Sequence, residues 1–252
     1  MLKSFKISVV LNTYNSEKYL DRVLSAVRDA DEILICDMYS KDNTVEIAKK
    51  FGAKIIYHDN TGYVEPARNF AIQSAKNEWV LLLDSDELIT PYLKDKIKHL
   101  ITHPECSAYY FPRKNYFLGR WMRSAYPDYV CRLFRKNDID WPKEIHSQPK
   151  VNGKIEKLSY KDTANAIEHL ADENVSLLLN KTNQYTTAEI TKRKAQNITP
   201  LKLIFSPSLW FFKFYFLKGG VRDGIPGFIF SVLKAHYKFI TLAKLYESKY
   251  KR

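Results

Sequence analysis

Four short apolar runs alternate with amphipathic helical patterns over the first hundred residues, and this alternation constrains the fold more than any other feature of the chain. The runs are residues 7–11, 33–36, 54–57 and 79–83. Strands that are apolar on both faces are typical of a parallel sheet, because its crossover helices cover the sheet on both sides. The sequence therefore predicts an α/β fold in which helices flank a central sheet.

Spacing and breaking residues indicate the remaining elements. An apolar stripe at helical spacing follows the first strand and is formed by Leu20, Val23, Leu24 and Val27. A helix is expected from about Pro66 to Ala75, and another over about 172–194. Further strands are expected at 109–111, 130–134 and 155–158. Thr199-Pro200 ends the last of these helices, so we expect one domain over residues 1–200 and a helical extension over residues 201–252.

Length and composition exclude several classes of chain. With 252 residues and 45% hydrophobic side chains, the chain can form a sizeable core and is not a disordered polymer. It contains no apolar run of about eighteen residues, so no membrane-spanning helix is predicted. Residues 1–5 lead directly into the first predicted strand, so we expect no signal peptide. Three widely spaced cysteines, Cys36, Cys106 and Cys131, form no disulfide or zinc pattern, which is typical of a reducing cytoplasm.

Positive charge is concentrated in the extension. Of a net charge of +12, residues 201–252 carry +8, from ten Lys and Arg against Asp223 and Glu247. Its second helical pattern is apolar apart from one polar stripe, formed by Ser231, Lys234, Lys238, Thr241, Lys244 and Ser248. An apolar body with basic edges predicts contact with an anionic membrane surface, on the inner face of the cytoplasmic membrane. Packing on the first domain, or a homodimer, are the alternatives.

The sharpest chemical signal is the triplet Asp84-Ser85-Asp86, directly after the fourth apolar run. In a parallel sheet, ligands bind beyond the carboxyl ends of the strands. If the backbone is still extended there, side chains two residues apart point the same way, so both carboxylates would face one point. Mg²⁺ or Mn²⁺ bound to a phosphate-bearing substrate requires such oxygen ligands. The alternative is a surface turn that leads into a helix at Pro91.

Two further residues lie where a nucleotide would bind. Asp37 ends the second strand, where a carboxylate can accept a hydrogen bond from a ribose hydroxyl or a base N–H. Arg68 begins the third helix, and a guanidinium matches a diphosphate with paired donors. Alone, Asp37 could instead cap a helix, and Arg68 could lie on a solvated helix face.

These residues form an ordered series that resembles the family-2 glycosyltransferases, inverting enzymes of the GT-A fold. The series comprises residues 9–15, Ile35-Cys36-Asp37 with Ser40, Asp42 and Thr44, Ala67-Arg68-Asn69, and Leu83 to Glu87. Residues 126–129 with Arg132-Leu133-Phe134, and residues 217–224, resemble the branch of lipopolysaccharide core β-glucosyltransferases.

The resemblance implies a GT-A nucleotide-binding sheet and a role for each matching residue. Thr13 and Tyr14 would cradle the base, Asp37 would bind the base or ribose, and Arg68 would contact the base or diphosphate. Glu17 and Ser85 join this nucleotide-binding set. Asp84 and Asp86 would hold the Mg²⁺ or Mn²⁺ that bridges the phosphates. The donor would be a nucleotide sugar, with a UDP-hexose favoured, and the acceptor a cell-surface glycan or lipid-linked glycan.

An inverting transfer also needs a carboxylate that removes the acceptor hydroxyl proton. Asp128 is the candidate, because it corresponds to the acid that family members place before a strand with a downstream arginine, here Arg132. Glu144 is the alternative base. His146 is a candidate for a further metal ligand or a diphosphate contact.

Two other functions are compatible with parts of the sequence. A sequence pI of about 9.4 and the basic aromatic extension could indicate nucleic-acid binding. However, the aromatics alternate with Leu and Ile in helical patterns, which favours burial or lipid contact, so no nucleic-acid partner is expected. An inactive protein with a glycosyltransferase fold is the other alternative, since fold does not determine function.

Overall fold

The computed structural model describes residues 6–62, 64–142, 148–192 and 198–248. The chain forms two compact units. The first unit consists of Met1–Arg113 and Pro127–Leu170, and the second consists of Lys114–Tyr126 and Ala171–Arg252. Each unit is described by itself below.

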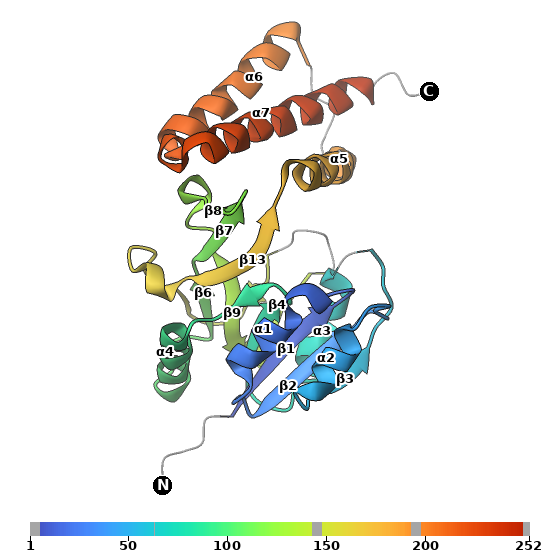
Figure 1. Ribbon diagram of the computed structural model, residues 1–252, viewed down its shortest axis with the longest axis vertical. Helices are drawn as coiled ribbons and strands as arrows, with labels where there is room; N and C mark the ends of the chain where they lie inside the picture. The colour runs from blue at the N-terminus through green and yellow to red at the C-terminus, as the bar shows by residue number, and fades with distance from the viewer. Residues whose placement is uncertain (1–5, 63, 143–147, 193–197, 249–252) are drawn as a thin grey trace. The chain divides into compact units, whose positions relative to one another are not determined.

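A seven-stranded sheet forms the centre of the first unit (Figure 1). Its strand order is β12-β6-β9-β4-β1-β2-β3. The strands are β1 (Ile7–Thr13), β2 (Glu32–Asp37), β3 (Lys54–Tyr57), β4 (Trp79–Asp84), β6 (Ala108–Phe111), β9 (Val130–Arg135) and β12 (Ile155–Lys157). Strands β1 to β4 are parallel, as the apolar runs predict, and β9 is antiparallel to β4 and β6.

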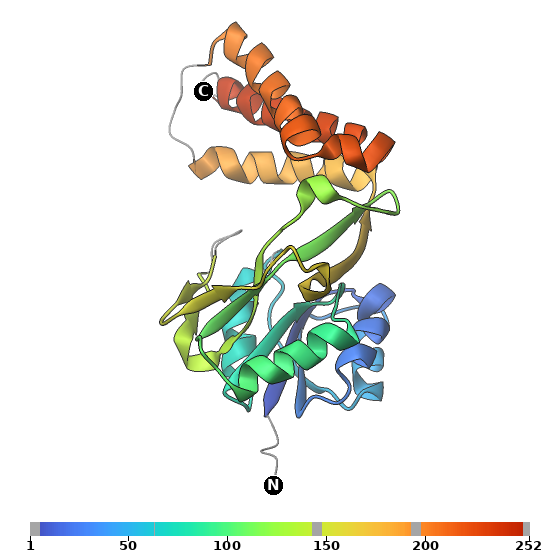
Figure 2. The same ribbon diagram turned by 90° about the vertical axis from the view of Figure 1, so that its left-hand side faces the viewer.

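Helices cover both faces of this sheet (Figure 2). The helices are α1 (Glu17–Val27), α2 (Thr44–Lys50), α3 (Glu65–Gln73) and α4 (Pro91–Thr102). Helices α1, α2 and α4 pack on the face that carries Val9, whereas α3 packs on the face that carries Val10. The predicted stripe of α1 is fully buried, and each Leu or Val in it contributes about 2 kcal/mol. The α/β fold predicted from the sequence is therefore confirmed.

A short antiparallel ladder lies next to the carboxyl end of β4. Strand β5 (Glu87–Leu88) follows β4 after a two-residue turn and pairs with β13 (Ile167–Glu173), so that His169 lies opposite Glu87. The first unit also contains the hairpin of β10 (Ile139–Asp140) and β11 (Lys150–Val151). The β5–β13 ladder brings a residue from position 169 to the end of a strand that finishes at Asp84.

The second unit is mainly helical. Its elements are β7 (Arg113–Phe117), β8 (Arg120–Trp121), α5 (Val175–Lys192), α6 (Pro200–Phe212) and α7 (Gly224–Glu247), with short helical turns at Lys213–Leu217 and Gly220–Asp223. The helix expected over 172–194 is thus α5, and Thr199 caps α6 by accepting a hydrogen bond from the Lys202 amide. Phe117, Met122 and Phe230 form one small core of this unit, and Ile198, Leu242 and Leu245 form another.

Asp223 fixes the turn between α6 and α7. It is 1% exposed and accepts hydrogen bonds from the Arg123 amide (3.0 Å), the Ser124 amide (2.9 Å) and the Ser124 hydroxyl (2.7 Å). A Cβ on Gly227 would lie 2.0 Å from the Gly220 carbonyl oxygen, so the close approach at this turn requires glycine.

Residues 114–126 and 171–200 therefore group with the extension, whereas the sequence predicts a boundary at residue 200. The physical reason is that α5 packs along α7. Tyr237 donates a hydrogen bond to Glu189, and the Lys244 ammonium donates to the Asn183 carbonyl oxygen. Within the described part of the chain, no helix is both long enough and apolar enough to cross a membrane.

Candidate active site

Strand register places the predicted site residues at one edge of the sheet. Thr13 of β1 pairs with Asp37 of β2, and Asn12 of β1 pairs with Asp84 of β4. Because these strands are parallel, their carboxyl ends and the loops that follow them meet at this edge. The first, second and fourth strands thus deliver Thr13, Asp37 and Asp84 to one place.

Asp37 is held in a buried hydrogen-bond network. Its Oδ1 accepts from the hydroxyls of Thr13 (2.8 Å) and Ser40 (2.6 Å), and its Oδ2 accepts from the Ser40 amide (2.8 Å). The Asp37 side chain is fully buried. A carboxylate offers about four acceptor positions, so these three bonds leave room for one more. Asp37 therefore orders the loop after β2 in addition to any contact with a ligand.

Two aromatic side chains stand beside this network. Tyr14 follows Thr13 and is 44% exposed. Tyr39 is 57% exposed, adopts a φ of +59°, and stacks on Tyr57 with ring centroids 5.4 Å apart. A left-handed conformation is unfavourable for a bulky residue, so the surrounding structure must impose it. The edge thus presents flat apolar rings next to a buried carboxylate.

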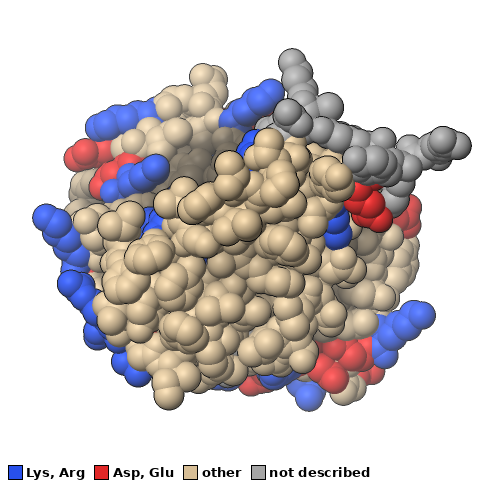
Figure 3. Space-filling model, turned by 90° about the horizontal axis from the view of Figure 1, so that it is seen from above, with Lys and Arg blue, Asp and Glu red and all other residues tan. Residues whose placement is uncertain are grey.

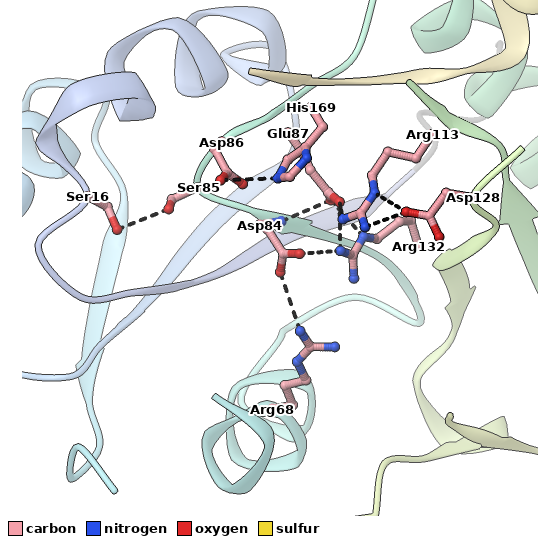
Figure 4. Close-up of polar contacts among 10 residues, drawn as sticks. All are labelled: Ser16, Arg68, Asp84, Ser85, Asp86, Glu87, Arg113, Asp128, Arg132 and His169. Atoms are coloured by element: carbon pink, nitrogen blue, oxygen red, sulfur yellow. Dashed lines mark hydrogen bonds and ion pairs between the residues drawn. The ribbon is translucent and has the colours of Figure 1, made fainter. Parts of the chain in front are cut away.

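Glu17 and Ser85 connect neighbouring loops. The Glu17 carboxylate accepts from the backbone amide (3.0 Å) and side-chain amide (2.7 Å) of Asn43, just before α2. The Ser85 hydroxyl bonds to the Ser16 hydroxyl at 3.0 Å, which joins the turn after β4 to the loop after β1 (Figure 4). Both residues shape the edge around the site.

The two aspartates of the triplet face different partners. Asp84 forms ion pairs with Arg132 and, at 3.5 Å, with Arg68, whereas Asp86 lies 3.3 Å from His169 (Figure 4). The prediction that both carboxylates face one point required an extended backbone through residue 86. The backbone leaves the strand at Asp84 and turns at Ser85 and Asp86, so the alternation of a strand no longer applies.

Glu87 is the buried centre of the arginine network. It has no exposed side-chain surface and accepts from the Arg132 Nε (2.7 Å), the Arg132 Nη2 (2.8 Å) and the Arg113 Nη1 (3.0 Å). Arg113 in turn donates from its Nε (3.1 Å) and Nη2 (2.6 Å) to Asp128 Oδ2. A chain of charge-assisted hydrogen bonds therefore links Asp84, Glu87 and Asp128 through two guanidinium groups.

Burial and ion pairing shift the pKa values of three members of this network. Burial alone would raise the pKa of Asp84, but the guanidinium groups of Arg132 and Arg68 hold it well below its usual range. Burial alone would lower the pKa of Arg132, but Asp84 and Glu87 raise it above its ordinary value. Burial lowers the pKa of Arg68, with Asp84 opposing the shift. The ion pairs with Arg132 and Arg68 thus favour the ionised form of Asp84, and those with Asp84 and Glu87 favour the ionised form of Arg132.

Asp86 and His169 form the part of the site best suited to a cation. Their side chains are 28% and 15% exposed, and they offer one carboxylate oxygen and one imidazole nitrogen. No cluster of three or more potential protein ligands occurs among the residues described. Mg²⁺ and Mn²⁺ are commonly bound by one or two carboxylates, with substrate phosphates completing the coordination shell. The pair, with Asp84 beside it, fits that kind of site.

Asp128 and the remaining candidates occupy different parts of the chain. Asp128 lies just before β9 and is 39% exposed, paired with Arg113. Glu144 and His146 lie outside the described residues. Sequence reasoning missed three residues of this site: His169, Glu87 as a buried counter-ion, and Arg113. Only Glu87 carried a local signal, its place next to the acidic triplet.

Comparisons with known proteins show which family the chain belongs to. The model of glycosyl transferase family 2 matches residues 8–157. An uncharacterized glycosyltransferase of Rickettsia typhi is 29% identical over 255 residues, which cover 96% of this chain and 87% of the relative. The lipopolysaccharide core biosynthesis glycosyltransferase LpsC of Rhizobium meliloti is 25% identical, over 98% of this chain and 94% of the relative. A crystal structure of Staphylococcus aureus TarS is 19% identical, covers 97% of this chain and 92% of that one, and has a TM-score of 0.48. Since the family model spans more than half of the chain, the protein belongs to glycosyltransferase family 2.

Proposed function

We propose that this protein transfers a hexose, with inversion, from a nucleoside-diphosphate sugar to a cell-surface glycan or lipid-linked glycan. The observation that carries the proposal is the convergence of buried ion pairs at the carboxyl edge of the sheet. Arg68 and Arg132 lie on both sides of Asp84, with Asp86 and His169 next to them (Figure 4). An edge of this kind is where α/β proteins bind nucleotides.

The charges of the cluster match a diphosphate that brings a cation with it. Four carboxylates (Asp84, Asp86, Glu87 and Asp128) and three guanidinium groups (Arg68, Arg113 and Arg132) leave one net negative charge. A diphosphate would add about two more negative charges to this site. A divalent cation next to Asp86 would offset them, which supports metal-dependent donor binding.

Asp86 and His169 would hold Mg²⁺ or Mn²⁺, with Asp84 close by. Carboxylate ligands suit both ions, and the imidazole favours Mn²⁺ of the two. When bound, the cation would stabilise the negative charge of the departing nucleoside diphosphate. Arg68 would contact the diphosphate, since its guanidinium is held next to Asp84 and over the Trp141 ring, 4.6 Å from the ring centroid.

The nucleoside would lie against the loops after β1 and β2. Tyr14 and Tyr39 offer exposed rings for stacking on the base. Asp37 would accept from a base N–H or a ribose hydroxyl only if the loop after β2 moved, because its side chain is fully buried, and Thr13, Glu17 and Ser85 keep these loops in place. Uridine remains the favoured base.

Asp128 would act as the base of the transfer. As the acceptor oxygen bonds to the anomeric carbon, the bond from that carbon to the diphosphate oxygen breaks on the opposite face, and the acceptor proton passes to Asp128. The Arg113 guanidinium lies 2.6 Å from Asp128 Oδ2 and would hold this carboxylate in place for the acceptor. Its side chain is 39% exposed, so a hydroxyl can approach it.

A lipid-linked acceptor would also place the protein at a membrane surface. LpsC, which covers nearly the whole chain, is named for lipopolysaccharide core biosynthesis. An acceptor attached to a lipid is reached at a membrane surface, and the +8 charge of residues 201–252 favours an anionic one. The predicted place is peripheral, on the inner face of the cytoplasmic membrane.

A thermal-shift screen tests the donor class. Nucleoside diphosphates and nucleotide sugars, each with Mg²⁺, Mn²⁺ or chelator, are titrated against the full chain, because specific binding raises the unfolding temperature by mass action. We expect UDP and a UDP-hexose to stabilise the protein only when the cation is present. Stabilisation by no nucleotide under any of these conditions would contradict the proposal and favour an inactive scaffold.

A further inference from the structure

The turn between α6 and α7 exposes large apolar side chains that a water-facing turn would avoid. We call residues 212–228 the hairpin tip. Within the tip, Leu217 is 84% exposed, Ile225 76%, and Phe212, Phe216 and Val221 each more than 50%. Single exposed apolar residues are ordinary, but a contiguous group of this size marks an interaction surface.

Helix α7 buries polar side chains and exposes large apolar ones. Members of its predicted polar stripe point into the unit: Ser231 and Thr241 are at most 1% exposed. The Lys244 ammonium donates to the Asn183 carbonyl oxygen at 2.8 Å and to the Thr187 hydroxyl at 2.7 Å, both on α5. Phe230, Leu242 and Leu245 are buried as well, so polar and apolar side chains share the inward side of α7, while Ile225, Phe228, Val232 and Phe239 remain exposed on the outward side.

The outward side of α6 and α7 forms one continuous apolar surface. Helix α6 adds Leu201, Ile204, Phe205 and Leu209, each at least 60% exposed. An open groove of about 350 Å³ runs between the two helices, lined by Pro207, Phe211, Phe212 and Val232 among others. Figure 3 looks onto this side and shows a broad surface without charged side chains.

All the charged side chains that are exposed at the hairpin tip are positive. Lys213, Lys218 and Arg222 are exposed beside the apolar residues. The one acidic residue between positions 200 and 246 is Asp223, which is buried and bonded to backbone amides. Apolar side chains flanked by cations match the boundary between anionic headgroups and acyl chains in a bilayer.

We propose that the hairpin tip inserts into one leaflet of a membrane that contains anionic lipids, with Leu217 and Ile225 among the acyl chains and Lys213, Lys218 and Arg222 at the headgroups. This inference deepens the membrane part of the proposed function and rests on it for its biological purpose. A second copy of the chain is a poorer occupant. A twofold interface through the tip would bring the cations of both copies into one contact, with no exposed acid at the tip to pair with them.

Vesicle co-sedimentation of the full chain tests the apolar part of the proposal. The wild-type protein should bind phosphatidylcholine vesicles that contain phosphatidylglycerol. The double variant Leu217→Glu/Ile225→Glu should lose about a hundredfold or more in affinity, since two inserted side chains are lost and two negative charges face the anionic lipid. The matched control is Leu177→Glu/Leu179→Glu on α5, where both leucines are also exposed, and its affinity should stay close to wild type.

A second comparison tests the cationic part. The triple variant Lys213→Gln/Lys218→Gln/Arg222→Gln should bind about a hundredfold more weakly, at about fivefold per removed charge. The matched control removes three exposed lysines from the first unit, Lys49→Gln/Lys50→Gln/Lys54→Gln, and should lose much less. High salt should weaken the wild-type protein more than the triple variant.

Nucleotide binding separates failure of this inference from failure of the proposed function. The tip variants should keep the metal-dependent stabilisation by UDP, and Asp86→Asn should keep vesicle binding. The inference is overturned if the wild-type protein does not bind anionic vesicles, or if Leu217→Glu/Ile225→Glu binds them as tightly as wild type. It is also overturned if light scattering shows a dimer that this double variant dissociates while vesicle binding is absent.

Discussion

Glu87→Gln is the substitution that most sharply tests how the site is held together. Glu87 is fully buried and accepts three hydrogen bonds of 2.7 to 3.0 Å from Arg132 and Arg113. Glutamine keeps the shape but removes the charge, and its amide group would place N–H donors against guanidinium donors. Two largely buried guanidinium groups would then lack their common counter-ion.

The expected loss of stability is large. Removing one partner of a buried ion pair costs about 3–5 kcal/mol, and although Arg132 keeps Asp84 and Arg113 keeps Asp128, neither guanidinium group recovers the buried bonds that it made to Glu87. In a protein of this size, 1 kcal/mol shifts the melting temperature by about 2–4 °C, so Tm should fall by about 6–20 °C. Urea unfolding at neutral pH and thermal unfolding should both show that Glu87→Gln is less stable than the wild-type protein.

The control is Glu78→Gln, the same substitution in a surface ion pair. Glu78 is 62% exposed and lies 3.6 Å from Arg135. Exposed pairs contribute about 0–1 kcal/mol, so Tm should fall by no more than about 4 °C. If Glu87→Gln destabilises the protein no more than Glu78→Gln does, Glu87 is not the counter-ion of the network, and the described organisation of the site is incorrect.

Three further predictions concern the chemistry of the site. Asp128→Asn should keep metal-dependent stabilisation by UDP but lower the rate of sugar transfer by about 10²–10⁴, and an unchanged rate in a donor-consumption assay would assign the base elsewhere. His169→Gln should weaken UDP binding in Mn²⁺ and leave UDP binding in chelator unchanged. Titration calorimetry measures both affinities, and an equal loss of affinity in Mn²⁺ and in chelator would place His169 outside the metal site. The pKa of Asp84 is depressed by Arg132 and Arg68, so its stabilising effect is complete above about pH 4, the value of a free carboxyl, and is lost as pH falls through the lower folded pKa. Thermal unfolding between about pH 6 and 2 should therefore show a smaller acid-induced loss for Asp84→Asn than for wild type, and parallel curves would contradict this assignment.

The sheet could be predicted from sequence because its signals are local. The central parallel strands β1, β2 and β4 are runs of largely apolar residues, since both of their faces are covered, and the α1 stripe from Leu20 to Val27 repeats at the helical period. Pro91 and Pro200 stand at the first positions of α4 and α6, where a missing N–H costs nothing. Residues such as Asp37 and Asp84 then follow at the strand ends.

The rest of the site depends on contacts between distant residues, for which the sequence carries no local signal. His169 reaches Asp86 through the pairing of β5 with β13, between segments some eighty residues apart. The direction of the Asp84 side chain depends on where β4 ends and on Arg132 from β9. Helix α5 joins the second unit through Asn183 and Lys244, a contact that the charge pattern of the extension does not indicate.

Calorimetric titration of UDP into wild-type protein and Asp86→Asn, each with Mn²⁺ and with chelator, tests the central claim most directly. If the carboxyl edge of the sheet binds a diphosphate through a cation, wild-type protein should bind UDP much more tightly in Mn²⁺ than in chelator. Asp86→Asn should lose most of that difference while it keeps the wild-type unfolding temperature in the absence of ligand. Equal UDP affinity of the two proteins in Mn²⁺, or no UDP binding by wild type, would contradict the account.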